Sequence, residues 1–507
     1  MLSAVILDPD LCHRALLARD VRFDGRFFTG VRTTGVYCRP VCPARTPRRE
    51  NCRFFPSAAA AEGAGFRACL RCRPETAPEL GAWRGTSNTV ARALALIEAG
   101  ALDDGDVEAL GDRLGVGGRQ LRRLFKQHLG ASPVGVAQTR RVLLAKQLIH
   151  ETDLPMTAVA LASGFGSVRR FNETFQQLYG RPPGALRRRT AAPAPATRPL
   201  TVRLRYRPPY DWEALFDYLK PRALPGVERV EGDRYARTLV VGGHAGSVTV
   251  QPVGGDQVAV GVRFPSVSVL PQVLARVRRV FDLAADPAVI GEHLSRDPAM
   301  ARLAAARPGL RVPGAWDGFE AAVRTIVGQQ ITVTQAVRIV SGLAERYGEP
   351  LPEAWAADGL SRTFPSPAAL AAADLAHLPM PRARSRALES LAAAVAADPA
   401  VLAPAPSLED AVRRLRALPG VGEWTAQYVA LRELREPDAF PASDVALLRA
   451  AADGAGVRPT PAELLARAEA WRPWRAYAAV HLWTSLDGGP ALNEPAHDPR
   501  SADRAAA

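Results

Sequence analysis

The sequence predicts a multidomain, mainly α-helical protein with four folded units: a small zinc-binding α+β domain, a double helix-turn-helix, a second α+β domain and an all-α helix-hairpin-helix domain. Three observations predict this organisation. All six cysteines lie in the first 72 residues. A helical pattern of glycines and aromatic residues repeats with Phe125 and Phe175 in equivalent places. A Pro/Ala-rich linker then precedes alternating apolar residues, and after these only helical patterns occur.

The composition favours a polyanionic partner. The chain of 507 residues carries 65 Lys and Arg against 51 Asp and Glu, a net charge of +14. The N-terminal apolar run is too short for a signal peptide, and no apolar stretch is long enough to span a bilayer, so we expect a cytoplasmic protein without membrane contact. The lack of cysteine after residue 72 excludes a cysteine-ligated iron–sulfur cluster.

Residues 1–80 contain two cysteine pairs at metal-ligand spacing. A Cys-x3-Cys pair and a Cys-x2-Cys pair predict one tetrahedral zinc site, with the ligands Cys38, Cys42, Cys69 and Cys72. Four thiolates on Zn²⁺ leave a formal charge of about −2, which keeps a sulfur nucleophilic unless neighbouring groups donate hydrogen bonds to it. A purely structural zinc site is the alternative.

The residues around these cysteines resemble a known family. The segments 30–40 and 64–69 are similar to the N-terminal domain of Ada-type adaptive-response regulators. The resemblance implies that Cys38 accepts a methyl group irreversibly from a methylated DNA phosphotriester. Loss of one negative charge on methylation would raise the affinity for DNA. The candidate phosphate contacts are Arg39, Arg45, Arg67 and Arg71.

Residues 84–190 contain two copies of one helical pattern, joined by a long helix expected from about residue 133 to 150. The pattern resembles the AraC-type DNA-binding module, whose second helices enter successive major grooves. Those helices are expected at 118–129 and 167–179, and Arg and Asn side chains on them can contact bases. A generic helical bundle with solvated charges is the alternative. The candidate DNA contacts are Arg119, Arg122, Arg169, Arg170 and Asn172.

Residues 191–200 form the Pro/Ala linker, and residues 201–284 alternate as strands with two helices, expected at 211–220 and 268–282. This unit resembles the small α+β, TBP-like N-terminal domain of AlkA-type enzymes. Its expected role is structural.

Residues 285–500 are expected to be all-helical around a Leu-Pro-Gly-Val-Gly hairpin at 418–422. An apolar stripe predicts a helix that Pro419 ends, and a second helix begins at about Glu423. The free N–H groups of that second helix and its preceding glycines suit a DNA phosphate. The candidate DNA contacts of the hairpin are Gly420, Gly422 and Thr425.

The hairpin and the segments 307–313, 319–330, 440–444 and 471–483 resemble the helix-hairpin-helix DNA glycosylases, most closely the AlkA type of 3-methyladenine DNA glycosylase. The resemblance implies that Asp444 is the catalytic carboxylate. It also implies a DNA-3-methyladenine glycosylase II activity and a monovalent cation on the carbonyls of Arg416, Leu418 and Val421. The substrate pocket is expected to contain Trp424, Tyr428, Trp483, Gln329 and Gln330.

Two positions refine this expectation. Relatives that also cut the strand carry a lysine where this chain has Trp424, so a monofunctional enzyme is predicted. The residue expected to fill the vacated base stack is a leucine in close relatives, and here it is Gln330, which loses apolar burial. For Trp471 and Trp474 we expect core packing.

Together the motifs predict an alkylation-response protein in which a methyl-phosphotriester sensor and transcriptional activator is fused to a glycosylase. The alternative is a DNA-binding transcriptional regulator whose glycosylase half is weak or inactive. The expected partners are double-stranded DNA, both alkylated and promoter, and RNA polymerase. The chain is expected to act as a monomer.

Overall fold

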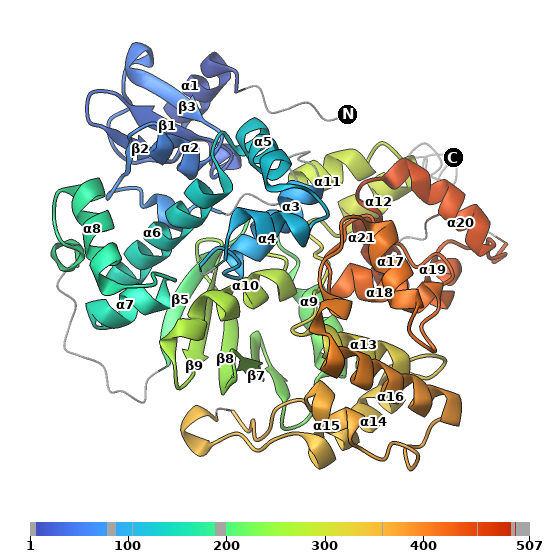
Figure 1. The fold of residues 1–507 in the computed structure, drawn as a ribbon. Helices are drawn as coiled ribbons and strands as arrows, with labels where there is room; N and C mark the ends of the chain where they lie inside the picture. The colour runs from blue at the N-terminus through green and yellow to red at the C-terminus, as the bar shows by residue number, and fades with distance from the viewer. Residues whose placement is uncertain are drawn as a thin grey trace, which may run out of the picture.

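The computed structural model describes residues 7–78, 88–103, 105–187, 199–356, 358–453, 455–487 and 492. The N-terminal domain and the helices α6 to α8 lie together on one side, and the helices after α13 lie on the other (Figure 1). Residues 191–198 of the predicted linker lie outside the described residues. No helix within the described ranges is both long enough and apolar enough to cross a membrane.

The N-terminal domain is a four-stranded sheet with the strand order β3-β1-β2-β4. The β2–β4 pair is parallel, and the other two pairs are antiparallel. The elements are α1 (Pro9–Ala18), β1 (Phe28–Val31), β2 (Val36–Cys38), β3 (Cys52–Phe55), α2 (Ala58–Gly63) and β4 (Arg67–Ala68).

Six helices follow, and the two expected helix-turn-helix units are present as α4–α5 and α7–α8. Gly130 and Gly180 end the second helix of each unit in the left-handed conformation, which favours glycine. The helices are α3 (Asn88–Glu98), α4 (Val107–Asp112), α5 (Gly118–Leu129), α6 (Pro133–Glu151), α7 (Met156–Ala162) and α8 (Val168–Tyr179).

The third unit is a five-stranded antiparallel sheet with the order β5-β9-β8-β7-β6. The β7–β8 turn at Gly242 and Gly243 uses two positive φ angles, as a tight hairpin requires. The elements are β5 (Leu200–Arg205), α9 (Trp212–Leu219), β6 (Glu228–Glu231), β7 (Arg234–Val241), β8 (His244–Val253), β9 (Gln257–Arg263) and α10 (Leu270–Val280).

The rest of the described chain is helical, as expected, apart from short 3₁₀ turns and one isolated bridge between Pro350 and Arg362. Its helices are α11 (Pro287–Leu294), α12 (Pro298–Ala306), α13 (Gly318–Val327), α14 (Val333–Tyr347), α15 (Pro367–Ala371), α16 (Arg382–Ala397), α17 (Leu408–Arg416), α18 (Glu423–Arg432), α19 (Val445–Ala450), α20 (Pro461–Ala468) and α21 (Arg475–Ser485).

The hydrophobic cores do not follow the predicted domain boundaries. One cluster of buried residues combines Phe171 and Phe175 of α8 with Val202 and Val260 of the five-stranded sheet. The second helix-turn-helix unit and the second α+β domain therefore share one core.

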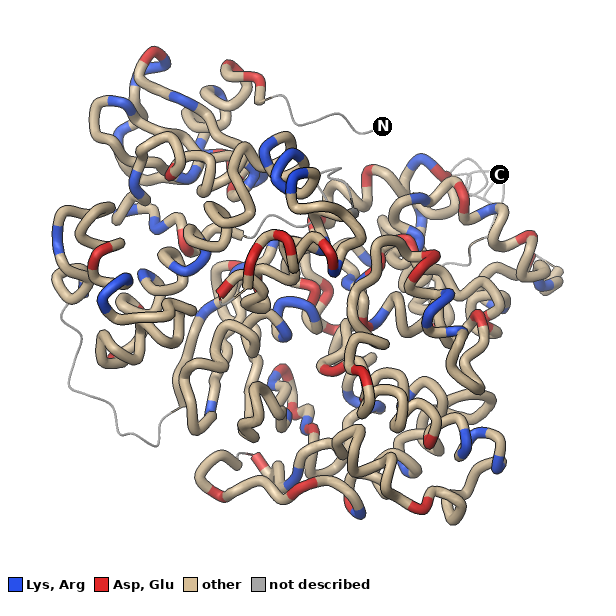
Figure 2. The backbone as a smooth tube through the Cα atoms, viewed as in Figure 1, with Lys and Arg blue, Asp and Glu red and all other residues tan. Residues whose placement is uncertain are grey.

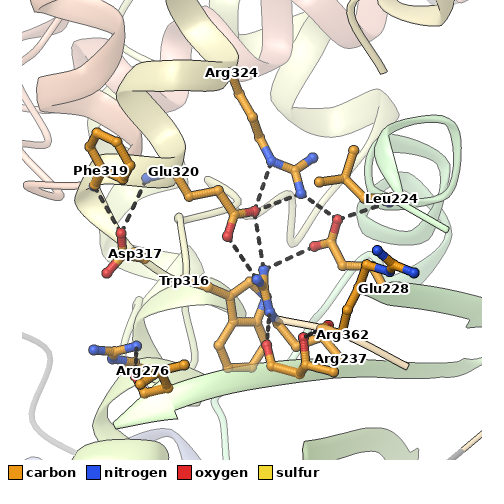
Figure 3. A network of polar contacts seen from close by, with 12 residues as sticks. Leu224, Glu228, Arg237, Arg276, Trp316, Asp317, Phe319, Glu320, Arg324 and Arg362 are labelled. Atoms are coloured by element: carbon orange, nitrogen blue, oxygen red, sulfur yellow. Dashed lines mark hydrogen bonds and ion pairs between the residues drawn. The ribbon is translucent and has the colours of Figure 1, made fainter. Parts of the chain in front are cut away.

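A buried charge cluster joins this sheet to α13 (Figure 3). Arg237 bonds to Glu320 at 2.7 Å and to Glu228 at 3.1 Å, and Arg324 bonds to the same two carboxylates at 2.6 and 2.5 Å. Burial opposes ionisation of Glu320, but the charges of Arg237 and Arg324 outweigh it and hold the pKa of Glu320 at about 2. The cluster fixes the helix that leads directly into Gln329 and Gln330.

Candidate functional site

The parallel strands β2 and β4 bring the two cysteine pairs together. Tyr37 pairs with Ala68, so Cys38 and Cys69 follow at the same edge of the sheet. The sulfur atoms of Cys38, Cys42, Cys69 and Cys72 all lie within 4.8 Å of one another, and all four residues are buried. Four thiols at this spacing fit the tetrahedral coordination that zinc prefers.

Backbone amides distinguish one sulfur from the other three. The amide of Arg39 donates to Cys72 Sγ and that of Arg71 donates to Cys69 Sγ, each at 3.4 Å. The amide of Ala44 donates to Cys42. Within the described residues Cys38 Sγ accepts no amide hydrogen bond. Such bonds withdraw electron density from a thiolate, and among the described residues Cys38 Sγ is the sulfur that lacks them.

The position of Arg39 corrects one expectation. Its side chain is buried and paired with Asp24, and it also donates to the Cys72 carbonyl at 3.2 Å and to Thr76 Oγ1 at 2.8 Å. Arg39 therefore stabilises the inside of the domain and does not lie on its surface. Arg45 and Arg71 are exposed, and Arg67 is half-buried.

Basic residues gather on α5 in the first helix-turn-helix unit (Figure 2). Arg122 pairs with Glu108 at 2.9 Å, and in α8 Arg169 pairs with Glu173 at 2.7 Å. Such surface pairs contribute little to stability. Within these two units, the five side chains predicted to contact DNA are all exposed: Arg119, Arg122, Arg169, Arg170 and Asn172.

The hairpin between α17 and α18 uses its two glycines differently. Gly420 has a φ of +76°, and a Cβ there would lie 2.4 Å from the Cβ of Ala387. Gly422 has open space around it and begins α18 without a side-chain cap. The backbone at Gly422 is thus exposed at a helix N-terminus, a suitable place for a phosphate.

Gln329 and Thr425, two residues predicted to contact DNA or the substrate, form hydrogen bonds within the hairpin region. Gln329 donates to the Gly420 carbonyl at 3.2 Å and to Thr425 Oγ1 at 2.9 Å, and Thr425 is buried. The buried position of Thr425 corrects the expectation that it faces DNA. Gln329 connects the turn after α13 to the hairpin through these two hydrogen bonds. Gln330 is exposed and has a φ of +57°.

Asp444 caps the N-terminus of α19 and receives four N–H donors. Its Oδ1 accepts the amides of Ala446 and Leu447 at 3.0 Å and the indole of Trp483 at 3.0 Å. Among the residues that the structure describes, its Oδ2 accepts only the indole of Trp424, at 2.8 Å. The carboxylate is thus held rigidly, and Oδ2 has the free acceptor capacity.

Three aromatic rings surround this carboxylate. Trp424 stacks on Tyr428 with centroids 5.5 Å apart, and Tyr428 meets Trp483 edge to face at 6.0 Å. The sequence predicted these three residues together, but not that both indoles would donate to Asp444. Trp471 and Trp474 are buried, which confirms the predicted core packing.

The sequence missed two residues of this cluster. The guanidinium of Arg432 lies 4.4 Å from the ring centroid of Tyr218, 5.1 Å from that of Tyr428 and 5.2 Å from that of Trp483. Arg432 follows Tyr428 by one helical turn, so the spacing could have revealed it. Tyr218 comes from α9, so the second α+β domain contacts the aromatic cluster beside Asp444.

Four protein families match successive parts of the chain. The family described as "Metal binding domain of Ada" matches residues 11–75, and a "Helix-turn-helix domain" matches residues 110–189. The "AlkA N-terminal domain" matches residues 201–317, and the "HhH-GPD superfamily base excision DNA repair protein" family matches residues 323–476.

A Mycobacterium tuberculosis (strain H37Rv) protein named "Probable bifunctional transcriptional activator/DNA repair enzyme AlkA" is 42% identical over 484 residues, covering 95% of this chain and 97% of that protein. The chain belongs to this family of bifunctional AlkA-type proteins. It therefore joins an Ada-type regulator to a glycosylase.

Two other relatives each match one part of this bifunctional AlkA-type chain. "DNA-3-methyladenine glycosylase 2" of Escherichia coli K12 is 38% identical, covering 55% of this chain and 95% of that protein. The E. coli K12 "Bifunctional transcriptional activator/DNA repair enzyme Ada" is 36% identical, covering 32% of this chain and 45% of that protein. The solved "3-methyladenine dna-glycosylase from Archaeoglobus fulgidus" shares the fold, with a TM-score of 0.50 and 20% identity over 56% of this chain and 98% of that one.

Proposed function

We propose that the glycosylase half removes alkylated purines such as 3-methyladenine from double-stranded DNA by hydrolysing the N-glycosidic bond, and that Asp444 is its catalytic carboxylate. The observation that carries this proposal is the convergence of two indole and two backbone N–H groups on Asp444, beside a wall of aromatic rings.

The chemistry starts from the substrate. A purine alkylated at N3 or N7 carries a positive charge, so it leaves as a neutral base and the sugar becomes oxocarbenium-like. A fixed carboxylate beside the sugar stabilises that positive charge and orients the attacking water. Oδ2 is the oxygen suited to this role, because Oδ1 already accepts three hydrogen bonds.

The base must leave the stack before it can react. The faces of Trp424, Tyr428 and Trp483 attract a cationic base electrostatically. Gln330 is exposed in the turn after α13 and would fill the vacated stack. The amides at Gly422 and the first turn of α18 would bind a phosphate and hold the strand, and a monovalent cation on the hairpin carbonyls would support this contact.

The enzyme is expected to leave an abasic site and not to cut the strand. Strand cleavage by this class needs an amine that forms a Schiff base with the sugar. Trp424 stands at that position, and its nitrogen donates to Asp444.

The test is release of 3-methyladenine from methylated duplex DNA by the wild type and by Asp444→Asn, with strand cleavage measured before and after alkali. We expect release by the wild type, loss of release in the variant, and cleavage only after alkali. If the wild type releases no base, the glycosylase proposal is wrong and the regulator alone is left.

A second activity is favoured by the amide pattern at the cysteines. We propose that Cys38 Sγ attacks the methyl carbon of a DNA methyl phosphotriester. The new S–C bond forms as the C–O bond breaks, and the electron pair stays on oxygen to give a phosphodiester anion. Bound zinc would keep the cysteines as thiolates.

Methylation removes one negative charge from the domain and so weakens its repulsion of DNA phosphates. The chain would then bind promoter DNA through α5 and α8 as a monomer and recruit RNA polymerase. Incubation of the zinc-loaded protein with methyl-phosphotriester DNA should add one methyl group to the peptide that contains Cys38, as measured by mass spectrometry. Cys38→Ala should abolish the transfer, and Asp444→Asn should retain it.

A further inference from the structure

Two phenol hydroxyls from different domains meet at the aromatic wall. The hydroxyl of Tyr218 on α9 lies 3.4 Å from that of Tyr428 on α18. Both residues are only partly buried. Arg432 donates to the Tyr428 hydroxyl, and within the described residues neither phenol has an acceptor other than its partner hydroxyl. The contact is long for two hydroxyl groups, so they are loosely tied and can turn toward a ligand.

The hydrogens of this pair leave one donor unused. Each phenol carries a single O–H hydrogen, and only one of the two can lie between the oxygens. Whichever hydroxyl donates to the other, the second O–H has no acceptor. A hydrogen-bond donor without a protein partner, in the wall of a binding site, favours a ligand with an acceptor atom.

Two cations strengthen this donor. The guanidinium groups of Arg222 and Arg432 lie 4.1 and 4.4 Å from the ring centroid of Tyr218. Burial would raise the pKa of Tyr218, but the charges of Arg432 and Arg222 hold it below its ordinary value. The more acidic hydroxyl donates the stronger hydrogen bond.

Hydrogen bonds connect the Tyr218 backbone to Arg324 of the buried charge cluster. Arg324 donates to the Arg222 carbonyl at 2.8 Å, and Arg222 donates to the Tyr218 carbonyl at 2.9 Å. The tyrosine is therefore fixed by contacts that come from α13 and not only by its own helix.

On the proposed glycosylase function, we propose that the Tyr218–Tyr428 hydroxyl pair donates a hydrogen bond to the departing base and thereby allows the excision of neutral modified purines. A cationic base leaves as a neutral molecule and needs no such help. When a neutral purine leaves, the electron pair of the glycosidic bond moves onto the base. The donated hydrogen bond stabilises that negative charge until solvent supplies a proton, while water adds to the sugar at C1′.

The experiment compares two substrates in single-turnover assays of the full chain: a duplex with hypoxanthine, a neutral purine, and one with 7-methylguanine, a cationic purine. The variants are Tyr218→Phe, Tyr428→Phe and the double variant. Each single variant keeps one phenol O–H, whereas the double variant keeps none.

We expect the ratio of the hypoxanthine release rate to the 7-methylguanine release rate to fall on the order of 10-fold or more in the double variant, as for loss of one acid–base contact. The single variants should lose less than the double variant. An equal loss for both bases, or no loss of hypoxanthine release in the double variant, overturns the proposal. So does a wild type that releases 7-methylguanine but not hypoxanthine, whereas release of neither base would contradict the glycosylase function itself.

Discussion

At the scale of single residues, the carboxylate of Asp444 depends on donors of unequal importance. Oδ2 accepts one hydrogen bond, from Trp424, whereas Oδ1 accepts three. Loss of the Trp424 N–H would free the oxygen that is suited to the sugar, while Oδ1 would keep its two backbone amides if the Trp483 N–H were lost. The two tryptophans therefore form a matched pair for mutation.

We predict that Trp424→Phe, which keeps a ring and removes the N–H, slows base release by roughly 10- to 100-fold, because a hydrogen bond to a charged group contributes about 1.5–3 kcal/mol. Trp483→Phe should slow it less. Single-turnover release of 3-methyladenine from duplex DNA measures both variants. Equal rates for Trp424→Phe and wild type would show that the indole N–H does not position the carboxylate.

A buried histidine makes stability depend on pH. Burial lowers the pKa of His481 from 6.5 to about 4, even though Asp211 and the Leu303 carbonyl act in the opposite direction. The unfolded chain therefore binds a proton at this residue below pH 6.5, while the folded chain binds it only near pH 4. The stabilising contribution of the neutral side chain is complete above pH 6.5 and is lost as the pH falls toward 4.

We predict that this loss reaches on the order of 3 kcal/mol at pH 4. His481→Gln, which does not titrate, should flatten the decline in thermal midpoint between pH 6.5 and 4 relative to the wild type. Parallel declines of the two proteins over that range would contradict the assignment.

The sequence motifs predicted the candidate carboxylate and two of its aromatic neighbours, because Asp444, Trp424 and Trp483 occupy recognisable positions near the hairpin. They could not give Tyr218, because it belongs to another domain and reaches the site only through tertiary packing. Arg39 was misjudged for a similar reason. An arginine beside a cysteine ligand suggests a surface contact, whereas Asp24, fifteen residues earlier, binds it inside the domain.

At the scale of elements, periodicity predicted the helices well and the strands less completely. The helix expected at 118–129 is α5 at Gly118–Leu129. The prediction is accurate because the apolar stripe of this segment ends where the glycine that terminates the helix follows. The strand β7 was not predicted, because its apolar residues run consecutively and it contains Arg234 and Arg237. Arg237 is buried with Glu228 and Glu320, and neither partner can be deduced from local sequence.

The hairpin offers a matched pair of glycines. We predict that Gly420→Ala destabilises the protein by at least about 1–2 kcal/mol, the cost of a left-handed non-glycine residue, because its Cβ also meets Ala387. Gly422→Ala has room for a Cβ and an ordinary φ of −83°, so it should keep the thermal midpoint.

If a phosphate approaches the backbone at Gly422, the added methyl group should still weaken binding to duplex DNA, as measured by fluorescence anisotropy. Unchanged DNA affinity of Gly422→Ala would show that the backbone approaches DNA elsewhere. An unchanged thermal midpoint of Gly420→Ala would contradict the predicted strain.

At the scale of the whole molecule, the regulator and the glycosylase are joined by buried polar contacts as well as by a shared core. Arg92 of α3 pairs with Glu436 at 2.6 Å, with side chains 8% and 5% exposed, and donates to the Pro406 carbonyl at 2.5 Å. Glu436 lies in the segment that connects α18 to Asp444. The helix-turn-helix half thus contacts the segment that leads to the proposed catalytic residue, Asp444.

We predict that Arg92→Met destabilises the protein by about 3–5 kcal/mol, because it leaves the Glu436 carboxylate buried without a cation. The double variant Arg92→Met/Glu436→Gln should recover part of this loss, since no charge is then buried. Arg413→Met is the control: Arg413 pairs with Asp410 at 3.0 Å on the surface, where it is 76% exposed, and such pairs contribute about 0–1 kcal/mol. Thermal unfolding measures all three variants. If Arg92→Met unfolds at the same temperature as Arg413→Met, the two halves are not held together by this pair but by other contacts, such as the shared core of α8 and the five-stranded sheet.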